Sequence, residues 1–326
     1  MTQVRTPTAG EPTPADARGA IELSQRLFEA VSATVRGKDE VVRLSLVALL
    51  AGGHLLVEDL PGTGKTLLAK SLAAALGGRF GRVQCTPDLL PTDITGTSVF
   101  SPADGSWTFR PGPLFANVLL VDEINRASPR TQAALLEPME EHQVTVDGLT
   151  HPLPDPFFCV ATQNPHGQIG TFPLPESQLD RFALVLSMGL PDRGAEREIL
   201  TGRGGNDAYA VLEPVADPAA VAEAIATVHS IFCAPALVEY VLDLAAATRV
   251  HPDLTIGASP RASVGLLQAA RAHAVVVGRE HVTPDDVQAV VGPAFAHRVS
   301  IAGGVDTAAG SSVIADIVAR TAVPRP

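Results

Sequence analysis

Residues 59–66 read DLPGTGKT, and no other stretch of this chain restricts its fold as strongly. An apolar run at 54–57 precedes them and helix-forming residues at 67–72 follow, so the sequence predicts a strand, a glycine turn and a helix. In such a turn, small residues let backbone N–H groups face phosphate oxygens, and the positive end of the helix adds to the attraction. The stretch is therefore predicted to be a P-loop, which binds a nucleoside triphosphate.

Two side chains of this P-loop have separate predicted roles. Lys65 supplies a positive charge for the β- and γ-phosphates, and the hydroxyl of Thr66 is suited to Mg²⁺. The first position of the usual pattern is Asp59 rather than glycine. Short glycine turns also precede helices in proteins that bind nothing, so the prediction depends on partner residues downstream. The residues expected to contact the nucleotide here are Pro61, Gly62, Thr63, Gly64, Lys65, Thr66 and Leu67.

The composition is typical of a globular protein. The 326 residues are enough for two domains with their own cores, and 46% of them are hydrophobic and 18% charged. The formal net charge is −11 and there is no basic stripe, which argues against a nucleic-acid-binding protein. The apolar run at 44–57 includes two glycines and a histidine, and it is too short to span a bilayer.

Cysteine usage and the N-terminal stretch predict the cellular compartment. Cys85, Cys159 and Cys233 have neither metal-binding nor redox spacing, which is typical of small core residues in a reducing compartment. Residues 1–18 are rich in Pro, Thr and Ala, which predicts a disordered tail, and they lack the apolar block of a secretory signal. We therefore expect a cytoplasmic protein.

The first half of the chain alternates between two kinds of pattern. Strand-like runs recur, with helical stretches between them, at 55–57, 82–85, 118–121 and 157–160. This alternation predicts the α/β class, as a three-layer domain with a mostly parallel sheet. Asp-Gly pairs at 104–105 and 147–148 interrupt the pattern. Such pairs favour tight turns, so two β-hairpins should project from this domain.

The composition changes after Pro191. Residues 192–207 are rich in glycine and charge, as expected for a connector, and from about Pro218 the chain is rich in alanine with a helical period. Helices are predicted near 219–231, 235–249, 260–277 and 284–290. The predicted organisation is a tail at 1–18, an α/β nucleotide-binding domain at 19–192, a connector at 193–217 and a helical domain at 218–326.

An apolar strand at 118–121 ends in two adjacent carboxylates, Asp122 and Glu123. Ligands of open α/β sheets bind at the carboxyl ends of the strands, which places both acids beside the P-loop. Asp122 is suited to hold Mg²⁺ through water, and Glu123 to orient or deprotonate an attacking water. The alternative is an ordinary strand end with solvated acids.

Three polar residues further along have two interpretations each. Asn164 ends a strand and could contact the γ-phosphate and the attacking water, or simply start a turn before proline. Arg181 suits a fixed phosphate contact from a neighbouring subunit, or a surface pair with Asp180. Arg261 follows a predicted N-cap at 259–260, where its charge opposes the helix dipole. Its partner should therefore lie elsewhere, as a phosphate or a carboxylate.

Together these motifs resemble the MoxR family of AAA+ ATPases from about Gly37 to Arg298. The single motifs are shared by all AAA+ proteins, but TPDLLPTDITG, DEINRA and PLPESQLDRF in combination are specific to this family. The matching blocks are QCTPDLLPTDITGT at 84–97, GPLFANVLLVDEINRA at 112–127, TQAALLEPMEEHQVTVDG at 131–148, ATQNP at 161–165, GTFPLPESQLDRF at 170–182 and GASPRA at 257–262.

The resemblance implies a P-loop AAA+ three-layer core with a C-terminal all-α helical lid domain. It implies that the two hairpins are the helix-2 insert and the pre-sensor-1 insert. The residue roles that it implies are Walker A at 59–66, Walker B at Asp122 and Glu123, sensor 1 at Asn164, a finger acting in trans at Arg181, sensor 2 at Arg261 on the lid, and an adenine pocket lined by Val35 and Gly37.

The chain departs from the family pattern at a few positions. Pro138 lies in the helix after Walker B, which should therefore end or kink early. Asp59 replaces the first Walker glycine, a change that the resemblance implies is tolerated. Arg126 and Arg130 add positive charge near the expected subunit interface, and either could share the role of Arg181.

These residues predict an Mg²⁺-dependent ATPase, and the resemblance implies that it assembles into a ring, expected to be a hexamer. ATP and Mg²⁺ would lie between the α/β domain and the lid of one subunit, and lid rotation would follow the state of the γ-phosphate. The expected catalytic residues are Lys65, Glu123, Asn164, Arg181 and Arg261.

The resemblance also implies a cellular role. Relatives act as chaperone-like remodellers or activators of partner proteins, often with von Willebrand factor A-domain proteins and often in metal-cofactor insertion. The client protein is not implied. Two alternatives are a nucleotide-gated assembly protein with little turnover and a DNA-acting AAA+ ATPase, which the acidic balance disfavours. A P-loop kinase would not need the arginines at 181 and 261.

Overall fold

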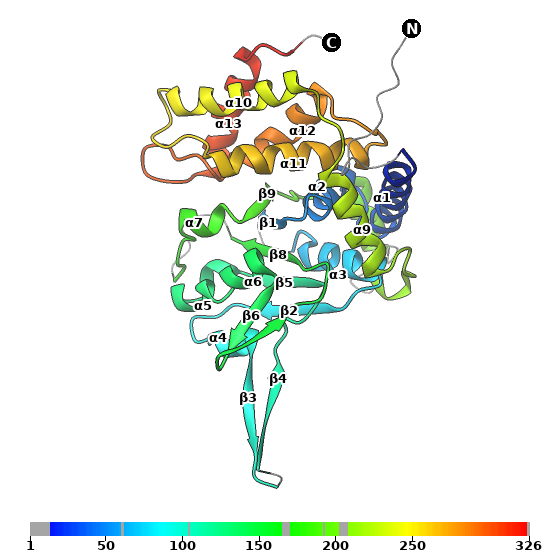
Figure 1. Cartoon of the computed structure of the whole chain (residues 1–326), viewed down its shortest axis with the longest axis vertical. Helices are drawn as coiled ribbons and strands as arrows, with labels where there is room; N and C mark the ends of the chain where they lie inside the picture. The colour runs from blue at the N-terminus through cyan, green and yellow to red at the C-terminus, as the bar shows by residue number, and fades with distance from the viewer. Residues whose placement is uncertain are drawn as a thin grey trace.

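A five-stranded parallel sheet forms the centre of the α/β part of the chain (Figure 1). The computed structural model describes residues 14–59, 62–103, 105–164, 170–191, 193–201 and 208–324. Across the sheet the strands lie in the order β2 (Phe80–Gln84), β5 (Val118–Asp122), β8 (Phe158–Gln163), β1 (His54–Glu58) and β9 (Phe182–Leu186). The predicted α/β class and parallel sheet are confirmed.

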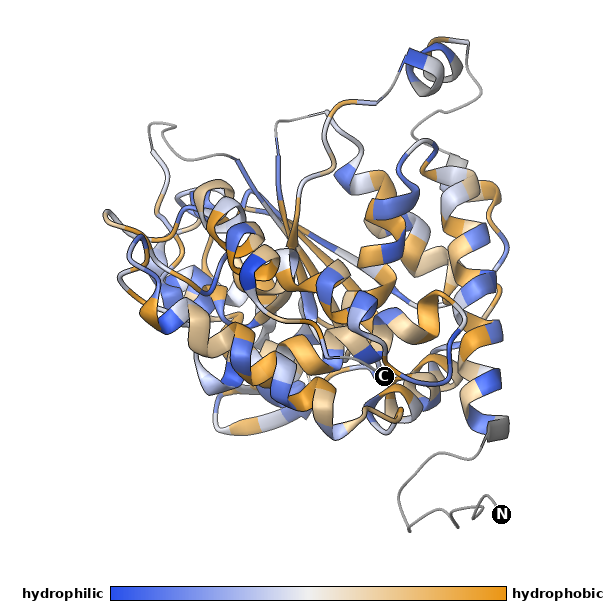
Figure 2. Ribbon diagram, turned by 90° about the horizontal axis from the view of Figure 1, so that it is seen from above, coloured by the Kyte–Doolittle hydropathy of each residue, from blue (hydrophilic) through white to orange (hydrophobic). Residues whose placement is uncertain are grey.

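Four of the five strands match the predicted runs, and β9 is an additional one. It pairs in parallel with β1, so that Leu55 lies beside Leu184 and Val57 beside Leu186. All residues of β5 and β8 are buried, as expected for parallel strands that are covered on both faces. Apolar residues fill the sheet and the inward sides of the helices, which leaves polar residues on the outer sides (Figure 2).

Different helices cover the two faces of the sheet. One face packs against helices from the start of the chain and from the P-loop, and the apolar clusters show that the other packs against short helices between the strands. The first set is α1 (Pro14–Thr34), α2 (Asp39–Leu50) and α3 (Lys65–Ala75), and the second is α4 (Pro91–Thr95), α5 (Pro129–Ala133), α6 (Leu136–Glu141) and α7 (Glu176–Leu179). Helix α1 includes residues 14–18, which we had expected in the tail; residues 1–13 lie outside the described residues.

The helical stretch after Walker B is broken, as Pro138 predicts. Helix α5 ends at Ala133, and α6 begins at Leu136 with Pro138 in its first turn, where proline is tolerated. The α6 segment is held against the sheet by His54, whose ring contacts the carbonyl oxygen of Met139 at 2.9 Å. This contact places α6 at the amino ends of the strands, since His54 is the first residue of β1.

Both predicted hairpins are present. One is formed by β3 (Gly96–Ser101) and β4 (Ser106–Pro111), and the other by β6 (Gln143–Val146) and β7 (Leu149–Pro152). Asp147 and Gly148 have φ values of 52° and 79°, the conformation that a tight hairpin turn requires. The β3–β4 hairpin projects far from the rest of the molecule (Figure 1). Its side chain Phe109 stacks on His151 of the second hairpin with ring centroids 4.1 Å apart.

The C-terminal part is helical, as predicted. Its helices are α9 (Pro218–His229), α10 (Pro235–Val250), α11 (Pro260–Val276), α12 (Pro284–Phe295) and α13 (Thr307–Arg320), of which α13 was not predicted. Ser259 caps α11 by accepting a hydrogen bond from the N–H of Ala262. Between the two parts lie the helix α8 (Arg193–Leu200) and the 3-10 helix η2 (Ala208–Val211).

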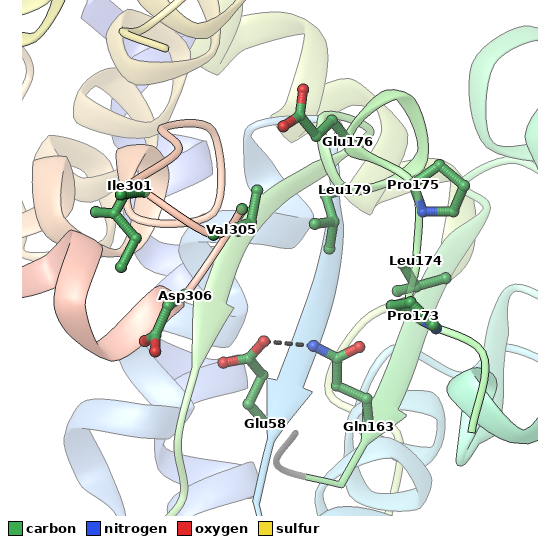
Figure 3. Close-up of a pocket in the computed structure, with 13 residues that line it drawn as sticks. Glu58, Gln163, Pro173, Leu174, Pro175, Glu176, Leu179, Ile301, Val305 and Asp306 are labelled. Carbon is green, nitrogen blue, oxygen red and sulfur yellow. Dashed lines mark hydrogen bonds between the residues drawn. The ribbon is translucent and has the colours of Figure 1, made fainter. Parts of the chain in front are cut away.

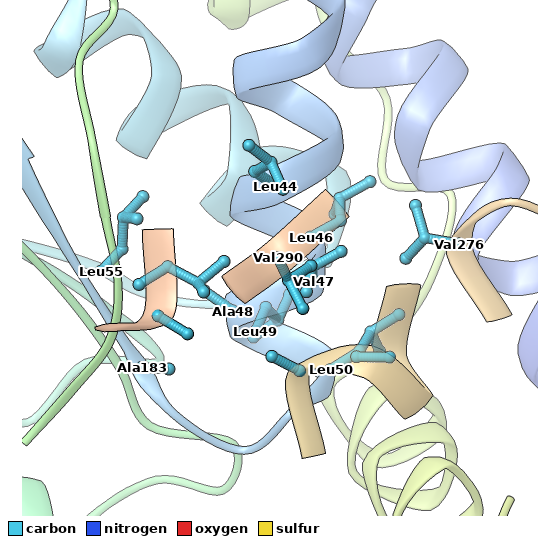
Figure 4. Packing of buried hydrophobic residues seen from close by; sticks show 14 of the residues in the cluster. Leu44, Leu46, Val47, Ala48, Leu49, Leu50, Leu55, Ala183, Val276 and Val290 are labelled. Atoms are coloured by element: carbon cyan, nitrogen blue, oxygen red, sulfur yellow. The ribbon is translucent and has the colours of Figure 1, made fainter. Parts of the chain in front are cut away.

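The helical part and the α/β part share one apolar core. A single buried cluster joins Leu46 and Leu50 of α2 with Val276 of α11, Val290 of α12 and Leu55 of β1 (Figure 4). The helices α11 and α12 lie along the β9 edge of the sheet, with α11 also packed on α2 (Figure 1). Within the described parts of the chain, we find no helix with the length and apolar character needed to cross a membrane.

Candidate nucleotide-binding site

The P-loop connects the end of β1 at Glu58 to the start of α3 at Lys65. Gly62 and Gly64 have φ values of 86° and 99°, so a residue with a side chain would be strained at either position. Gly64 is also the N-cap of α3, which places the amino end of this helix directly after the turn. Pro61, one of the predicted contacts, lies outside the described residues.

Lys65 extends toward the carboxyl ends of the strands. Its Nζ donates a hydrogen bond to the backbone oxygen of Asp59 at 3.0 Å. Burial lowers the pKa of Lys65, and the negative charges of Asp59, Asp122 and Glu123 oppose this change. These acids are therefore close enough to act on Lys65, so the structure brings the P-loop lysine and both Walker B carboxylates into one site.

Asp59 has a structural role that explains its place in the motif. Its carboxylate accepts hydrogen bonds from the N–H of Gly189, at 2.7 Å, and from Ser187 Oγ, at 3.4 Å. Both partners follow β9, so Asp59 ties the P-loop to the end of the neighbouring strand. A glycine at this position could not form these bonds, which shows why this chain can depart from the usual pattern.

Asp59→Gly should destabilise the chain, although it restores the usual Walker glycine. The substitution leaves the half-buried N–H of Gly189 without its acceptor, which costs about 1 kcal/mol in the free energy of unfolding. Urea denaturation measures this loss, and Asp59→Asn is the matched control because its amide oxygen can still accept. A stability equal to that of the wild type for Asp59→Gly would show that the tie to Gly189 contributes nothing.

Asp122 is the last residue of β5 and is buried. Its Oδ2 accepts from Arg82 of β2 in a salt bridge of 2.8 Å, and its Oδ1 accepts from Thr162 Oγ1 at 3.3 Å. Asp122 is thus a buried carboxylate already paired with a cation, rather than a solvated acid at a strand end. Together with the hydroxyl of Thr66 in the first turn of α3, it offers the hard oxygen donors that fit Mg²⁺.

Glu123 is held in place by polar side chains from three directions. Its Oε1 accepts from Asn164 Nδ2 at 3.3 Å, and its Oε2 accepts from Gln84 Nε2 at 3.4 Å and pairs with Arg126 Nε at 3.0 Å. The backbone of Glu123 has a φ of 55°, a left-handed conformation, and its N–H donates to Thr162. Such a conformation is unusual for a residue other than glycine and is often found at functional sites.

The predicted adenine pocket is linked to the P-loop through its neighbours. Val35 is buried and Gly37 has a φ of 70°, which turns the chain between α1 and α2. Next to them, Lys38 Nζ donates to the backbone oxygens of Gly189, at 3.1 Å, and Leu190, at 2.6 Å. Because Gly189 also donates to Asp59, the 35–38 segment is joined to the P-loop by one intervening residue.

Arg181, the predicted finger, and Arg261, the predicted sensor 2, lie together and away from the P-loop. Arg181 directly precedes β9 at the amino ends of the strands, and its guanidinium pairs with Glu140 of α6. Arg261 pairs with the same carboxylate at 3.3 Å and with Asp180 at 3.6 Å. The P-loop follows the other end of β1, about 16 Å away along a five-residue strand.

This arrangement corrects one expectation. We expected the lid to bring Arg261 over the nucleotide of its own chain, but the structure places Arg261 beside Arg181. The partners of Arg261 are carboxylates, which was one of the two alternatives left by the sequence. Arg126 pairs with Glu123 of its own chain, whereas Arg130 is exposed on α5.

A pocket of about 520 Å³ lies on the sheet face next to the P-loop strand (Figure 3). The loop 301–306, which leads into α13, forms one wall of this pocket. Glu58, the last residue of β1, accepts from Gln163 of β8 and from Thr307 Oγ1 at 3.1 Å. The helical part therefore contacts the residue just before the P-loop.

Sequence reasoning missed several residues of the site. Arg82 and Gln84 contact the two Walker B acids, and both belong to β2, which the sequence did predict. Arg82 and Gln84 are two residues apart on this strand, so their side chains point to the same face of the sheet. This spacing could have indicated that both belong to the site. No local pattern indicated Glu140, because its partners are distant in the sequence.

Comparison with known proteins identifies two matching families. Residues 54–184 match the ATPase family associated with various cellular activities (AAA), and residues 246–317 match the AAA lid domain. The first match contains the P-loop, both Walker B acids and Asn164, and the second contains Arg261. The site described above therefore belongs to an AAA nucleotide-binding domain.

Several curated proteins are similar over most of the chain. The chaperone MoxR1 of Mycobacterium tuberculosis is 41% identical over 290 residues, which cover 85% of this chain and 75% of that protein. The uncharacterized protein YeaC of Bacillus subtilis is 43% identical over 279 residues, covering 86% and 87%. The protein MoxR of Methylorubrum extorquens is 32% identical over 302 residues, covering 85% and 88%.

A solved structure has the same fold. The crystal structure of a proposed ATPase from Cytophaga hutchinsonii superposes with a TM-score of 0.85 at 31% sequence identity. The match covers 95% of this chain and 98% of that one. Both parts of the chain are thus included in the similarity.

Proposed function

Because the chain belongs to the MoxR family of AAA+ ATPases, we propose that it hydrolyses ATP with Mg²⁺ in a ring of identical subunits that remodels or activates partner proteins. The observation that carries the proposal is the meeting of Lys65, Asp122, Glu123 and Asn164 at the carboxyl ends of the strands. This is where open α/β sheets bind their ligands.

We assign each residue of this site a role from its chemistry and its position. Lys65 and the N–H groups of the P-loop would bind the β- and γ-phosphates. Thr66 and Asp122 would hold Mg²⁺, which would neutralise phosphate charge. Glu123 orients the attacking water and accepts its proton. Asn164 donates to Glu123 and so fixes the direction of this carboxylate.

The placement of Arg181 and Arg261 supports a site that two subunits complete. Both guanidiniums lie at the amino ends of the strands, whereas the nucleotide of the same chain binds at the carboxyl ends. An arginine that stabilises phosphoryl transfer must reach the γ-phosphate. We therefore assign both arginines to the nucleotide of the adjacent subunit, with six subunits as the expected number in the ring.

The role in the cell follows from the family and the composition. Relatives named as chaperones support action on other proteins, and we propose that von Willebrand factor A-domain proteins are partners and that metal-cofactor insertion is one use. A net charge of −11 supports a protein client rather than nucleic acid. Three free cysteines support a cytoplasmic location.

Lys65→Ala should weaken ATP binding by at least about 100-fold, since a charged hydrogen bond in a partly desolvated site is worth ~3 kcal/mol. Binding is measured by calorimetry with purified protein. Lys70→Ala is the matched control, because Lys70 lies on the same helix and its Nζ contacts Tyr209 instead. If Lys65→Ala binds ATP as tightly as Lys70→Ala, the proposed site is wrong.

A further inference from the structure

Five charged side chains form a cluster where α6, the start of β9 and the helical part meet. Glu140 comes from α6, and Asp180 and Arg181 directly precede β9. Arg261 lies in the first turn of α11, and Arg298 follows α12. The cluster joins both parts of the chain, and none of its members belongs to the P-loop or to Walker B.

Glu140 bridges two of the arginines. Its Oε2 accepts from Arg181 and its Oε1 lies 3.3 Å from Arg261. One carboxylate thus holds two guanidiniums side by side, with one oxygen for each. A phosphate group can do the same, because it also presents several oxygens to paired arginines.

Asp180, the other carboxylate, pairs mainly with the third arginine, Arg298. Arg298, whose side chain is only 6% exposed, donates to Asp180 Oδ1 at 2.8 Å and to the backbone oxygens of Asp180 and Phe182. The contact of Asp180 with Arg261 is longer, at 3.6 Å. Arg181 and Arg261 therefore depend on Glu140 for most of their neutralisation.

The cluster has an excess of positive charge. Its members carry three guanidiniums and two carboxylates, which leaves one positive charge uncompensated among these five. Burial lowers the pKa of Arg181, and the neighbouring charge of Arg261 lowers it further, so the two arginines repel each other. Arg261 also opposes the dipole of α11. An added anion would relieve both effects.

Glu140 is open to solvent at its place between the arginines. Its side chain is 45% exposed and that of Arg261 is 51% exposed, so both reach solvent. Arg181 is 16% exposed, and its buried Nε has no hydrogen-bond partner among the described residues. An anion that replaced the Glu140 carboxylate could therefore contact both guanidiniums and accept a hydrogen bond from Arg181 Nε.

We propose that Glu140 is an internal substitute for phosphate, which occupies Arg181 and Arg261 until the nucleotide of a second copy of this chain replaces it. That these arginines bind the triphosphate of this second copy is part of the proposed function, on which the inference rests. Glu140 is a positioning residue: it keeps the guanidiniums together before assembly and gives way when the phosphates of the next subunit arrive.

The test uses tripolyphosphate as the probe in a Lys65→Ala background, which weakens the P-loop site. Glu140→Gln in this background should bind tripolyphosphate about fivefold more tightly, because one competing ion pair is lost. Glu141→Gln is the control: it removes the same charge one residue away, and the Glu141 carboxylate accepts a hydrogen bond from Gln143 Nε2 rather than from an arginine of the cluster. Adding Arg181→Ala to Glu140→Gln should abolish the gain.

Equal affinities for Glu140→Gln and Glu141→Gln would overturn the proposal, as would a gain that survives Arg181→Ala. With Lys65 intact, Glu140→Gln should also assemble in ATP at a lower subunit concentration than Glu141→Gln, as measured by light scattering. The tripolyphosphate result needs no ring. A gain in binding without ATP-driven assembly would thus support Glu140 as the internal substitute and contradict the ring of the proposed function.

Discussion

Glu123→Gln should retain ATP binding and lower the rate of phosphate release by about 10²–10⁴-fold, the usual contribution of a general base. The amide preserves the shape of the side chain and can still contact Asn164 and Gln84, but it cannot accept a proton from water. Phosphate release at saturating ATP measures the turnover, and calorimetry measures the affinity.

The control for this substitution is Glu141→Gln, which makes the same chemical change at an exposed position of α6 and should leave turnover unchanged. A rate for Glu123→Gln close to that of the control would remove Glu123 from the chemistry. Loss of ATP binding together with turnover would instead show that Glu123 shapes the site rather than acting on water.

Arg181→Ala should lower turnover by about 10³–10⁵-fold, the range found for arginines that stabilise the transition state of phosphoryl transfer. Each copy of this variant keeps an intact P-loop and Glu123. Its ATP site is incomplete only because the adjacent copy no longer supplies Arg181. Mixing it with Glu123→Gln should therefore restore activity, since about one quarter of the interfaces in random mixed rings combine the two intact halves.

The mixing experiment separates action in trans from action in cis. If Arg181 served the nucleotide of its own chain, a mixture of the two variants would be no more active than either alone. The double variant Arg181→Ala, Glu123→Gln, mixed with either single variant, is the control for nonspecific stabilisation. Rescue by the double variant would contradict the assignment of both residues.

Local patterns were sufficient to predict most of the fold. The P-loop, four of the five strands, both hairpins and the helices α9, α10, α11 and α12 follow from periodicity, caps and turn residues within short windows. The strand β9 was not predicted, because all five of its residues are buried, and a short apolar run without alternation cannot be told from a buried helix by its periodicity. Helix α13 was missed because Gly310 and two serines weaken its helical signal.

The site was predictable only where its residues follow strand ends. Lys65, Asp122, Glu123 and Asn164 lie together because parallel strands place their carboxyl ends at one edge of the sheet. The position of Arg261 depends instead on how α11 packs against α2 and β9, which no short stretch of sequence encodes. Its link to Glu140, and through it to Arg181, is a consequence of this packing.

The shared apolar core has a mechanical consequence. Two parts of a chain usually move relative to each other when the contact between them is small and polar. Here Leu46 and Leu50 of the α/β part and Val290 of the helical part belong to one close-packed apolar cluster. Opening a hinge between the two parts would expose this cluster to water. In the proposed ring, ATP hydrolysis should therefore tilt whole protomers as rigid bodies against each other.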